Sequence, residues 1–218
     1  MGQNFSSAGR VVRAIGAALL LAILMALPRS AVSQDKPSAN LGSVLGELRR
    51  GGFVIYFRHT ATDAVGAPDA QSDLNRCETQ RTLSAKGRAQ AAEIGAAIKA
   101  LEIPVGSVTT SPFCRTKDTA QLVFGRYTVD NDLYFVISTD ARETKRLTDS
   151  LRRMLSTPPA QGTNSVLVAH SANLREAAGI FAQPEGVAYV FRPLANGQYE
   201  MLATILPDEW SKAAERRR

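Results

Sequence analysis

Histidine, cysteine and tryptophan are scarce in this sequence of 218 residues, which has two His, two Cys and one Trp. Its 16 Gly and 10 Pro are close to average usage and follow no short period, which excludes collagen-like, low-complexity and solenoid architectures. Because 44% of the residues are hydrophobic and 21% are charged, disorder is excluded as the main state. The composition is that of one globular domain with a sizeable core.

No apolar stretch is long enough to span a bilayer, which takes roughly 20 residues. The longest, Ala14 to Leu27, is preceded by two arginines and followed by small residues up to Ser33. This order predicts a secretory signal peptide over residues 1–33; the alternative is an uncleaved membrane anchor. We therefore expect a periplasmic or secreted protein that contacts the membrane only through this segment, before cleavage.

Acidic residues are outnumbered, with 20 Asp and Glu against 26 Lys and Arg, but the excess lies near the ends of the chain. Residues 1–33 contain arginines and no acid, and the sequence ends in the run Arg216 to Arg218. We interpret residues 211–218 as a solvated basic tail and residues 34–210 as the domain. Nucleic acid is not an expected partner.

The two cysteines, Cys77 and Cys114, are a candidate disulfide pair if the chain is exported to an oxidising compartment. A bond between them would contribute about 4 kcal/mol on the chain-entropy estimate. In the cytosol the same residues would be two unrelated buried thiols.

Strand-like and helix-like segments alternate along the chain after residue 40. Strands are predicted at 53–57, 105–110, 165–169 and 187–191, with a weaker one at 133–137 and a last one at 199–206 after the turn Asn196-Gly197. Helices are predicted at 41–50, 84–101, 112–125, 142–155 and 173–181. The alternation predicts an α/β fold, with a parallel-dominated sheet, helices on both faces and an antiparallel C-terminal edge.

Basic side chains follow three of these strands. Arg58 and His59 end the first, His170 ends the strand at 165–169, and Arg115 lies just after the strand at 105–110. Ligands of open α/β sheets bind beyond the carboxyl ends of the strands, so these side chains are expected to meet at one site. Arginines and the helix N-terminus after Pro112 suit phosphate, and a neutral imidazole is a competent nucleophile.

A metal site is the rival interpretation of two histidines. No second carboxylate or thiolate lies at ligand spacing to either one, and nearby arginines would repel a cation. A serine hydrolase is disfavoured because the sequence lacks G-x-S-x-G. We expect no metal and no other cofactor.

Three segments resemble the signature elements of the histidine phosphatase superfamily in its phosphoglycerate mutase-like branch 1: Arg58 to Thr60, Thr110 to Arg115, and Val168 to Ser171. The chain looks like an exported bacterial-type member. The resemblance implies a three-layer α/β sandwich without a metal cofactor. It also implies that His59 accepts the phosphoryl group, and that Arg58, Arg115 and His170 bind and polarise the phosphate. Thr60 departs from the family pattern, which has Gly at this position.

The general acid is not identified by the resemblance. Mutase-like members carry a Glu between the second Arg and the second His, where this chain has Leu133 to Phe135. This short segment also argues against mutase activity. The carboxylates that remain as candidates are Asp63, Asp132, Asp140, Glu143 and Glu185.

The polar stretch from Thr60 to Thr82 is the expected site of substrate specificity, because long loops at the functional edge are usually lids or binding loops. A bond from Cys77 to Cys114 would hold this loop against the phosphate pocket. The charges in this loop, Arg81 among them, are equally well explained as solvated side chains.

We expect an exported phosphatase that hydrolyses a small phosphorylated molecule, a phosphomonoester, through a phosphohistidine intermediate at His59. One alternative is a phosphohistidine phosphatase, whose nitrogen leaving group lessens the need for an acid. The other is a non-catalytic module that binds a phospholigand. The sequence leaves the substrate and the oligomeric state open.

Overall fold

The computed structural model describes residues 39–63 and 72–217. The expected signal peptide, residues 1–33, lies outside these residues, so its assignment stays a prediction. Residues Pro37–Arg218 form one compact unit. Every helix in the described part of the chain is too short or too polar to cross a membrane.

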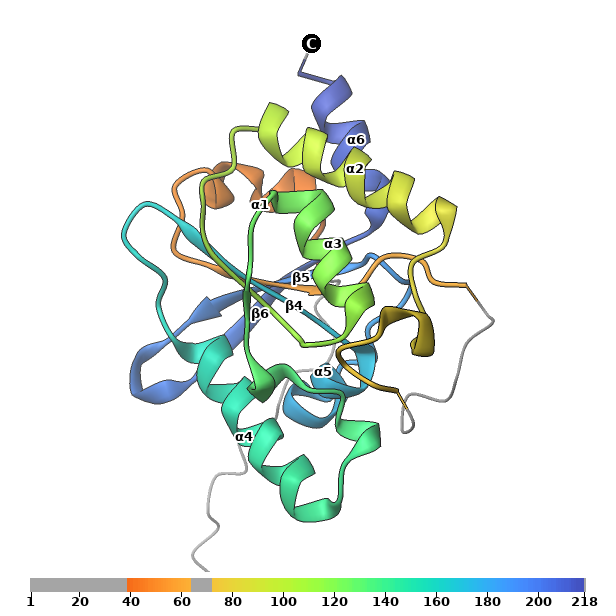
Figure 1. Cartoon of the computed structure of the whole chain (residues 1–218). Helices are drawn as coiled ribbons and strands as arrows, with labels where there is room; N and C mark the ends of the chain where they lie inside the picture. Colours follow the sequence, from red (N-terminus) through yellow and green to blue (C-terminus); the bar gives the residue numbers. More distant parts are fainter. Residues whose placement is uncertain (1–38, 64–71, 218) are drawn as a thin grey trace, which may run out of the picture. The chain divides into compact units, whose positions relative to one another are not determined.

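Within the described residues, six strands form a single sheet (Figure 1). They are β1 (Val54–Arg58), β2 (Val105–Thr110), β3 (Thr128–Val129), β4 (Asn164–Ala169), β5 (Ala188–Pro193) and β6 (Tyr199–Ile205), in the order β3-β2-β4-β1-β5-β6. The first four strands of this order pair in parallel, whereas β5 and β6 pair antiparallel. The predicted parallel-dominated sheet with an antiparallel C-terminal edge is confirmed.

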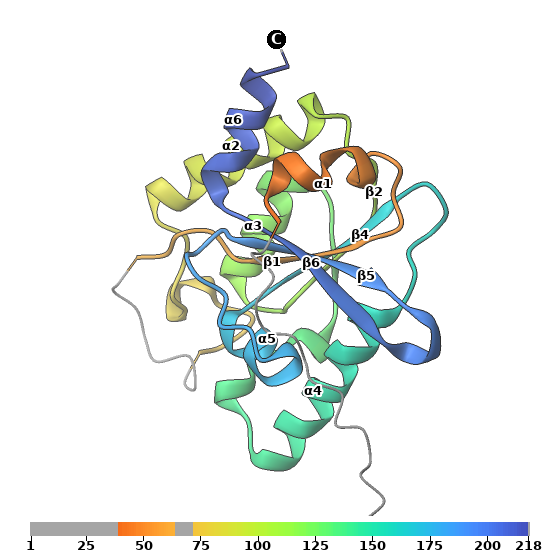
Figure 2. The same cartoon turned by 180° about the vertical axis from the view of Figure 1, so that it is seen from behind.

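Helices cover both faces of the sheet, which makes the predicted three layers (Figures 1 and 2). On one face lie α1 (Leu41–Leu48), α2 (Ala85–Ala100), α3 (Cys114–Phe124) and α6 (Pro207–Glu215). On the other lie α4 (Ala141–Ser156) and α5 (Ser171–Ala178). Short 3₁₀ turns are η2 (Cys77–Thr79), η3 (Asn131–Leu133), η4 (Val136–Ser138) and η5 (Ala195–Gly197).

Strand β1 runs through the middle of the core. Ile55 and Phe57 pack with the four-helix face, and Val54 and Tyr56 pack with the two-helix face. A strand covered on both faces has no solvent side, which explains why this stretch reads as a continuous apolar run. The residues that follow β1 are therefore held by a rigid support.

The prediction of a strand at residues 133–137 is wrong. This region forms the turns η3 and η4, because the side chain of Asp130 accepts a hydrogen bond from the backbone N–H of Asp132 at 2.8 Å and starts a turn. The hairpin predicted at Asn196-Gly197 is present: both residues have positive φ, 62° and 71°, and they join β5 to β6.

Helix α6 was not expected from the sequence. Pro207 occupies its first turn, and Trp210 is fully buried with its ring stacked on Phe57 at 5.9 Å between centroids. Residues 211–215 of the expected basic tail therefore belong to a helix that packs on the core.

Gly87 lets α2 approach the chain just after β1. A Cβ at Gly87 would lie 1.8 Å from the backbone oxygen of Ala61, which also accepts a hydrogen bond from the Ser84 backbone N–H at 3.0 Å. We expect Gly87→Ala to lower the free energy of unfolding by about 1–3 kcal/mol, because backbone must move to admit the methyl group.

The matched control is Gly46→Ala on the exposed side of α1, where a Cβ meets nothing within 4 Å. This variant should raise the stability by up to about 1 kcal/mol through helix propensity. Urea unfolding of the two variants measures the difference, and equal effects would show that the close approach at Ala61 is unimportant.

Candidate active site

The edge where β1, β2 and β4 end brings together all four residues assigned from the sequence. Arg58 pairs with Ala169 in the sheet register, so His59 and His170 each lie one residue beyond a paired strand end. The backbone N–H of His59 donates to the oxygen of Ala169 at 3.1 Å. Arg115 enters from the first turn of α3, and the four residues are at most 8% exposed.

His59 is held with one ring nitrogen free for chemistry. Its Nδ1 lies 3.0 Å from the carbonyl oxygen of Thr60, which can only accept, so Nδ1 carries the proton. Burial, followed by the charge of Arg115, holds the pKa of His59 well below its usual 6.5. The ring is therefore neutral near pH 7, and its Nε2 has a lone pair.

His170 has the opposite tautomer. Arg115 can only donate, and its Nη2 lies 3.2 Å from Nδ1 of His170, so the proton of the neutral ring is on Nε2. That nitrogen lies 2.8 Å from Oγ of Ser111, which accepts the proton's hydrogen bond. Burial, followed by the charge of Arg115, also keeps the pKa of His170 well below 6.5. The buried Tyr56 hydroxyl donates to the carbonyl oxygen of His170 at 2.7 Å and anchors the end of β4.

Aromatic rings surround the guanidinium of Arg115. Its Cζ lies 4.6 Å from the ring centroid of Phe113 and 5.5 Å from that of Phe135. The Phe135 ring is also 4.9 Å from the His170 ring. These rings exclude water and lower the local dielectric, so the charge of Arg115 acts strongly on any anion bound here.

Arg58 and Arg81 share the carboxylate of Glu185. The Nη2 atoms of Arg58 and Arg81 lie 3.1 Å and 4.0 Å from its Oε1. Arg58 also donates from Nη1 to the carbonyl oxygen of Ala182 at 3.0 Å. With Arg115, which lies beside His170, the described residues of the site comprise three arginines and one carboxylate, a net charge of +2 with both histidines neutral.

Two arginine donors at the site have no partner. Among the described residues, the Nε atoms of Arg58 and Arg81 are buried and make no hydrogen bond. A buried donor without a partner is costly, so these two donors are candidate contacts for an acceptor bound at the site.

Thr60 does not need the conformational freedom of the glycine that the family has at this position. Among the described residues, positive φ outside glycine occurs only at Glu102 and Asn196. The backbone N–H of Thr60 donates to Oγ1 of Thr119 at 3.1 Å, and the two hydroxyls lie 3.2 Å apart. The Thr60 hydroxyl is thus engaged with α3, which ties the segment after β1 to the helix that carries Arg115.

Of the five candidate acids, the structure brings only Glu185 to the site. Asp132 and Glu143 pair with Arg146, Asp140 caps the N-terminus of α4, and the Asp63 side chain is exposed. Phe135 occupies the region where an acid was sought. No carboxyl group at the site is therefore assigned as the proton donor.

The structure joins Cys77 to Cys114, as expected, with 5.7 Å between the Cα atoms. Beside this bond, the backbone N–H of Cys114 donates to Oε1 of the buried Gln80 at 2.9 Å. This first amide of α3 was expected to be free for phosphate; instead it anchors the loop. The bond and the amide contact together hold the segment that carries Arg81 against α3.

Arg81 and Ser111 were not assigned to the site from the sequence. Ser111 follows β2 directly, as His170 follows β4, so its place at a strand end was a usable signal. Arg81 lies in a loop, and only its nearness in the chain to Cys77 indicated its position.

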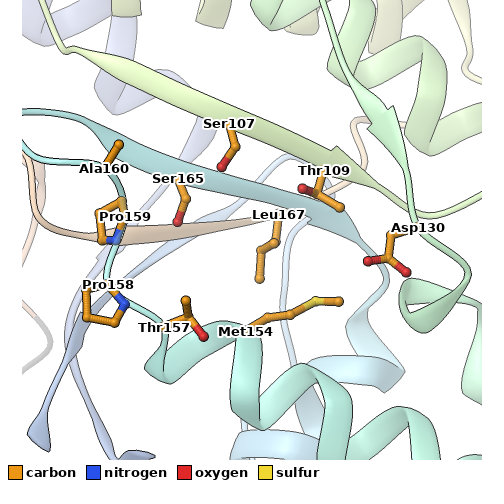
Figure 3. A pocket seen from close by; sticks show the side chains of 10 residues that line it. All are labelled: Ser107, Thr109, Asp130, Met154, Thr157, Pro158, Pro159, Ala160, Ser165 and Leu167. Carbon is orange, nitrogen blue, oxygen red and sulfur yellow. The ribbon is translucent and has the colours of Figure 1, made fainter.

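A separate cavity of about 310 Å³ lies on the two-helix face, away from these residues (Figure 3). Ser107 and Thr109 of β2 and Ser165 and Leu167 of β4 line its sheet side, opposite Met154 of α4. None of the site residues described above lines it.

The fold is that of an α/β protein, and a buried cluster of two histidines and arginines lies at one edge of its sheet. Residues 54–134 match the family model of the histidine phosphatase superfamily (branch 1). This segment carries Arg58, His59 and Arg115. Over these residues the chain is similar to the histidine phosphatase superfamily, in agreement with the resemblance of its sequence motifs.

Two solved structures illustrate the similarity. The protein histidine phosphatase SixA, complexed with tungstate, is 13% identical with a TM-score of 0.53, and the alignment covers 72% of this chain and 97% of that one. A candidate α-ribazole-5′-P phosphatase from Escherichia coli is 14% identical with a TM-score of 0.51, over 72% and 98% of the two chains. At these identities the similarity establishes the fold. No curated protein matches the sequence significantly.

The folded protein keeps two histidines neutral, which makes its stability depend on pH. In the unfolded chain both residues take up a proton as the pH falls below about 6.5, whereas the folded state does so only at lower pH because both pKa values are lowered. The unfolded state then binds more protons, so the free energy of unfolding decreases as the pH falls below about 6.5.

Urea unfolding at about pH 7.5 and about pH 5.5 tests this dependence on the wild type and on the double variant His59→Asn, His170→Asn. The variant should lose less stability between the two conditions. An equal loss in both proteins would show that these histidines do not carry the effect.

The disulfide bond should stabilise the fold and the loop that carries Arg81. Cys77 is exposed, so Cys77→Ser removes the bond with little change in packing. We expect it to lower the free energy of unfolding by about 4 kcal/mol, because the unfolded chain gains the freedom of the opened loop. Reductant should produce the same loss in the wild type and no further loss in the variant. Two free thiols in the unreduced, unfolded wild type would contradict the bond.

Proposed function

We propose that this protein is an exported, metal-independent phosphatase that hydrolyses a phosphomonoester through a phosphohistidine at His59. The observation that carries the proposal is the pair of buried, unpartnered arginine donors, on Arg58 and Arg81, at the same site as a neutral histidine. The match of residues 54–134 to the family model and the fold shared with solved phosphatases support phosphatase activity.

Phosphate is the ligand that best fits the charges. A phosphomonoester carries up to two negative charges near neutral pH, and the site has a net charge of +2. Arginine presents several N–H donors in one plane, which matches the oxygens of a phosphoryl group. Three arginines around one ligand also disfavour a metal cation, which supports metal independence.

In the proposed reaction, Nε2 of His59 attacks phosphorus in line with the ester oxygen. The N–P bond forms, the P–O bond breaks, and the leaving alcohol takes a proton from water. The Thr60 carbonyl keeps Nδ1–H in place and stabilises the positive ring that results. Water then attacks the phosphorus and breaks the N–P bond, which releases phosphate and restores the lone pair. The proton that this water gives up neutralises the hydroxide left by the first step. The arginines stabilise the phosphoryl oxygens throughout.

A phosphohistidine phosphatase is the second candidate function. It is favoured by the observation that no carboxyl group at the site is placed as an acid, since a nitrogen leaving group needs less help than an alkoxide. An exported enzyme does not meet cytosolic phosphoproteins, so export disfavours this second candidate function. Export itself is proposed from the composition of residues 1–33 and is supported by the disulfide bond.

Replacing His59 should abolish turnover and leave anion binding partly intact, because the arginines and His170 remain. We expect His59→Ala to reduce hydrolysis of p-nitrophenyl phosphate by several orders of magnitude with a chelator present, and still to bind vanadate. In the wild type, labelled phosphate on the protein should survive an alkaline quench and be lost in acid, since phosphohistidine is acid-labile.

Turnover by His59→Ala at the wild-type rate would refute the nucleophile. A wild type that binds vanadate but hydrolyses neither p-nitrophenyl phosphate, sugar phosphates nor phosphohistidine would indicate the non-catalytic binding module instead.

A further inference from the structure

The carboxylate of Glu185 makes hydrogen bonds with Arg58 and Thr62 at the site. Its Oε1 accepts from Nη2 of Arg58 at 3.1 Å and from the Thr62 hydroxyl at 2.9 Å, and its Oε2 accepts from the Thr62 backbone N–H at 2.9 Å. The side chain is 23% exposed. All three partners are donors, so both carboxylate oxygens of Glu185 are engaged as hydrogen-bond acceptors.

Glu185 also belongs to a segment whose backbone is hydrogen-bonded to the backbone of His59 and Arg58. The backbone N–H of Gly186 donates to the oxygen of His59 at 2.9 Å, and the N–H of Arg58 donates to Val187 at 3.0 Å. Residues on both sides of Glu185 are therefore fixed relative to β1. The carboxylate then sets the Arg58 guanidinium on one side and the segment at Thr62 on the other.

The position of Glu185 relative to His59 excludes a role as proton donor to the leaving group. Its Oε1 lies 4.0 Å from Nδ1 of His59, the ring nitrogen opposite the one that attacks phosphorus. In an in-line reaction the leaving oxygen departs from the far side of the phosphorus, away from this carboxylate. From the Nδ1 side, a negative charge stabilises the ring as it becomes positive.

We propose that Glu185 is a positioning residue that orients the Arg58 guanidinium and fixes the backbone at Thr62, just after His59. Its negative charge also weakens phosphate binding, so that the product is released. This proposal rests on the proposed function. Glu185 offsets one of three arginine charges, and without it the net charge of the site would rise from +2 to +3. An oxyanion would then bind more tightly, while Arg58 would lose the contact that orients it.

The test compares Glu185→Gln with Thr62→Val. Glutamine removes the charge and keeps one accepting oxygen, whereas valine removes only the hydroxyl that donates to Oε1. For Glu185→Gln we expect kcat to fall by about 10–100-fold and inorganic phosphate to bind about tenfold more tightly, measured by calorimetry and by product inhibition. For Thr62→Val we expect a smaller fall in kcat and unchanged phosphate affinity.

Two substrates separate positioning from acid catalysis. A positioning role predicts that Glu185→Gln slows p-nitrophenyl phosphate and an alkyl phosphate by the same factor. A loss of about 10²–10⁴-fold confined to the alkyl phosphate would overturn the proposal in favour of a general acid. Unchanged or weaker phosphate binding in Glu185→Gln would overturn the charge role.

Calorimetry also keeps this proposal separate from the proposed function. If the wild type hydrolyses no phosphoester, the phosphatase assignment fails, while phosphate affinity in the two variants still tests Glu185. If Glu185→Gln does not fold, Glu185→Asp keeps the charge and shortens the reach. It should then retain wild-type phosphate affinity with reduced kcat, and tighter binding would contradict the proposal.

Discussion

The parallel pairing of β1 with β4 is the constraint on which the site depends. Its register sets Arg58 beside Ala169, so the first residue beyond each strand is a histidine, and the two rings lie 5.7 Å apart between centroids. Both strands are buried on both faces, and the Tyr56 hydroxyl holds the carbonyl of His170. A shift of one residue in this pairing would exchange the side chains of β1 between its two packed faces, so the packing of the core also fixes the geometry of the site.

Burying positive charge at this edge is costly, and the surrounding residues reduce the cost in different ways. Arg115 is enclosed by aromatic rings, Arg58 reaches a carbonyl and a carboxylate, and both histidines remain neutral. The charge that is left suits a doubly negative ligand. In the proposed function, the same groups reduce the cost of burying this charge and favour a doubly negative ligand.

Loop residues are held at the site by contacts with residues that are distant in the sequence. Two contacts hold Arg81 beside Glu185 at the site: the disulfide bond from Cys77 to Cys114, and the hydrogen bond from the Cys114 backbone N–H to Gln80. Thr60 connects to Thr119 of α3, and Gly87 permits α2 to touch Ala61. The short segment after His59 is consequently fixed by contacts with α2, with α3 and with the chain around Glu185.

Much of this arrangement was determined by local sequence. Short-range preferences specify several elements: the apolar run of β1, the glycines that end helices and the turn at Asn196-Gly197. Because parallel strands end at one edge of a sheet, the sequence also placed His59, His170, Arg58 and Arg115 together. Helix α6 was missed because Trp210 is stabilised by contact with Phe57, far away in the chain. The positions of Arg81, Thr60 and Glu185 at the site were likewise decided only by tertiary structure. A charged or polar loop residue shows no periodicity in the sequence, and its partners depend on which distant segments the fold brings next to it.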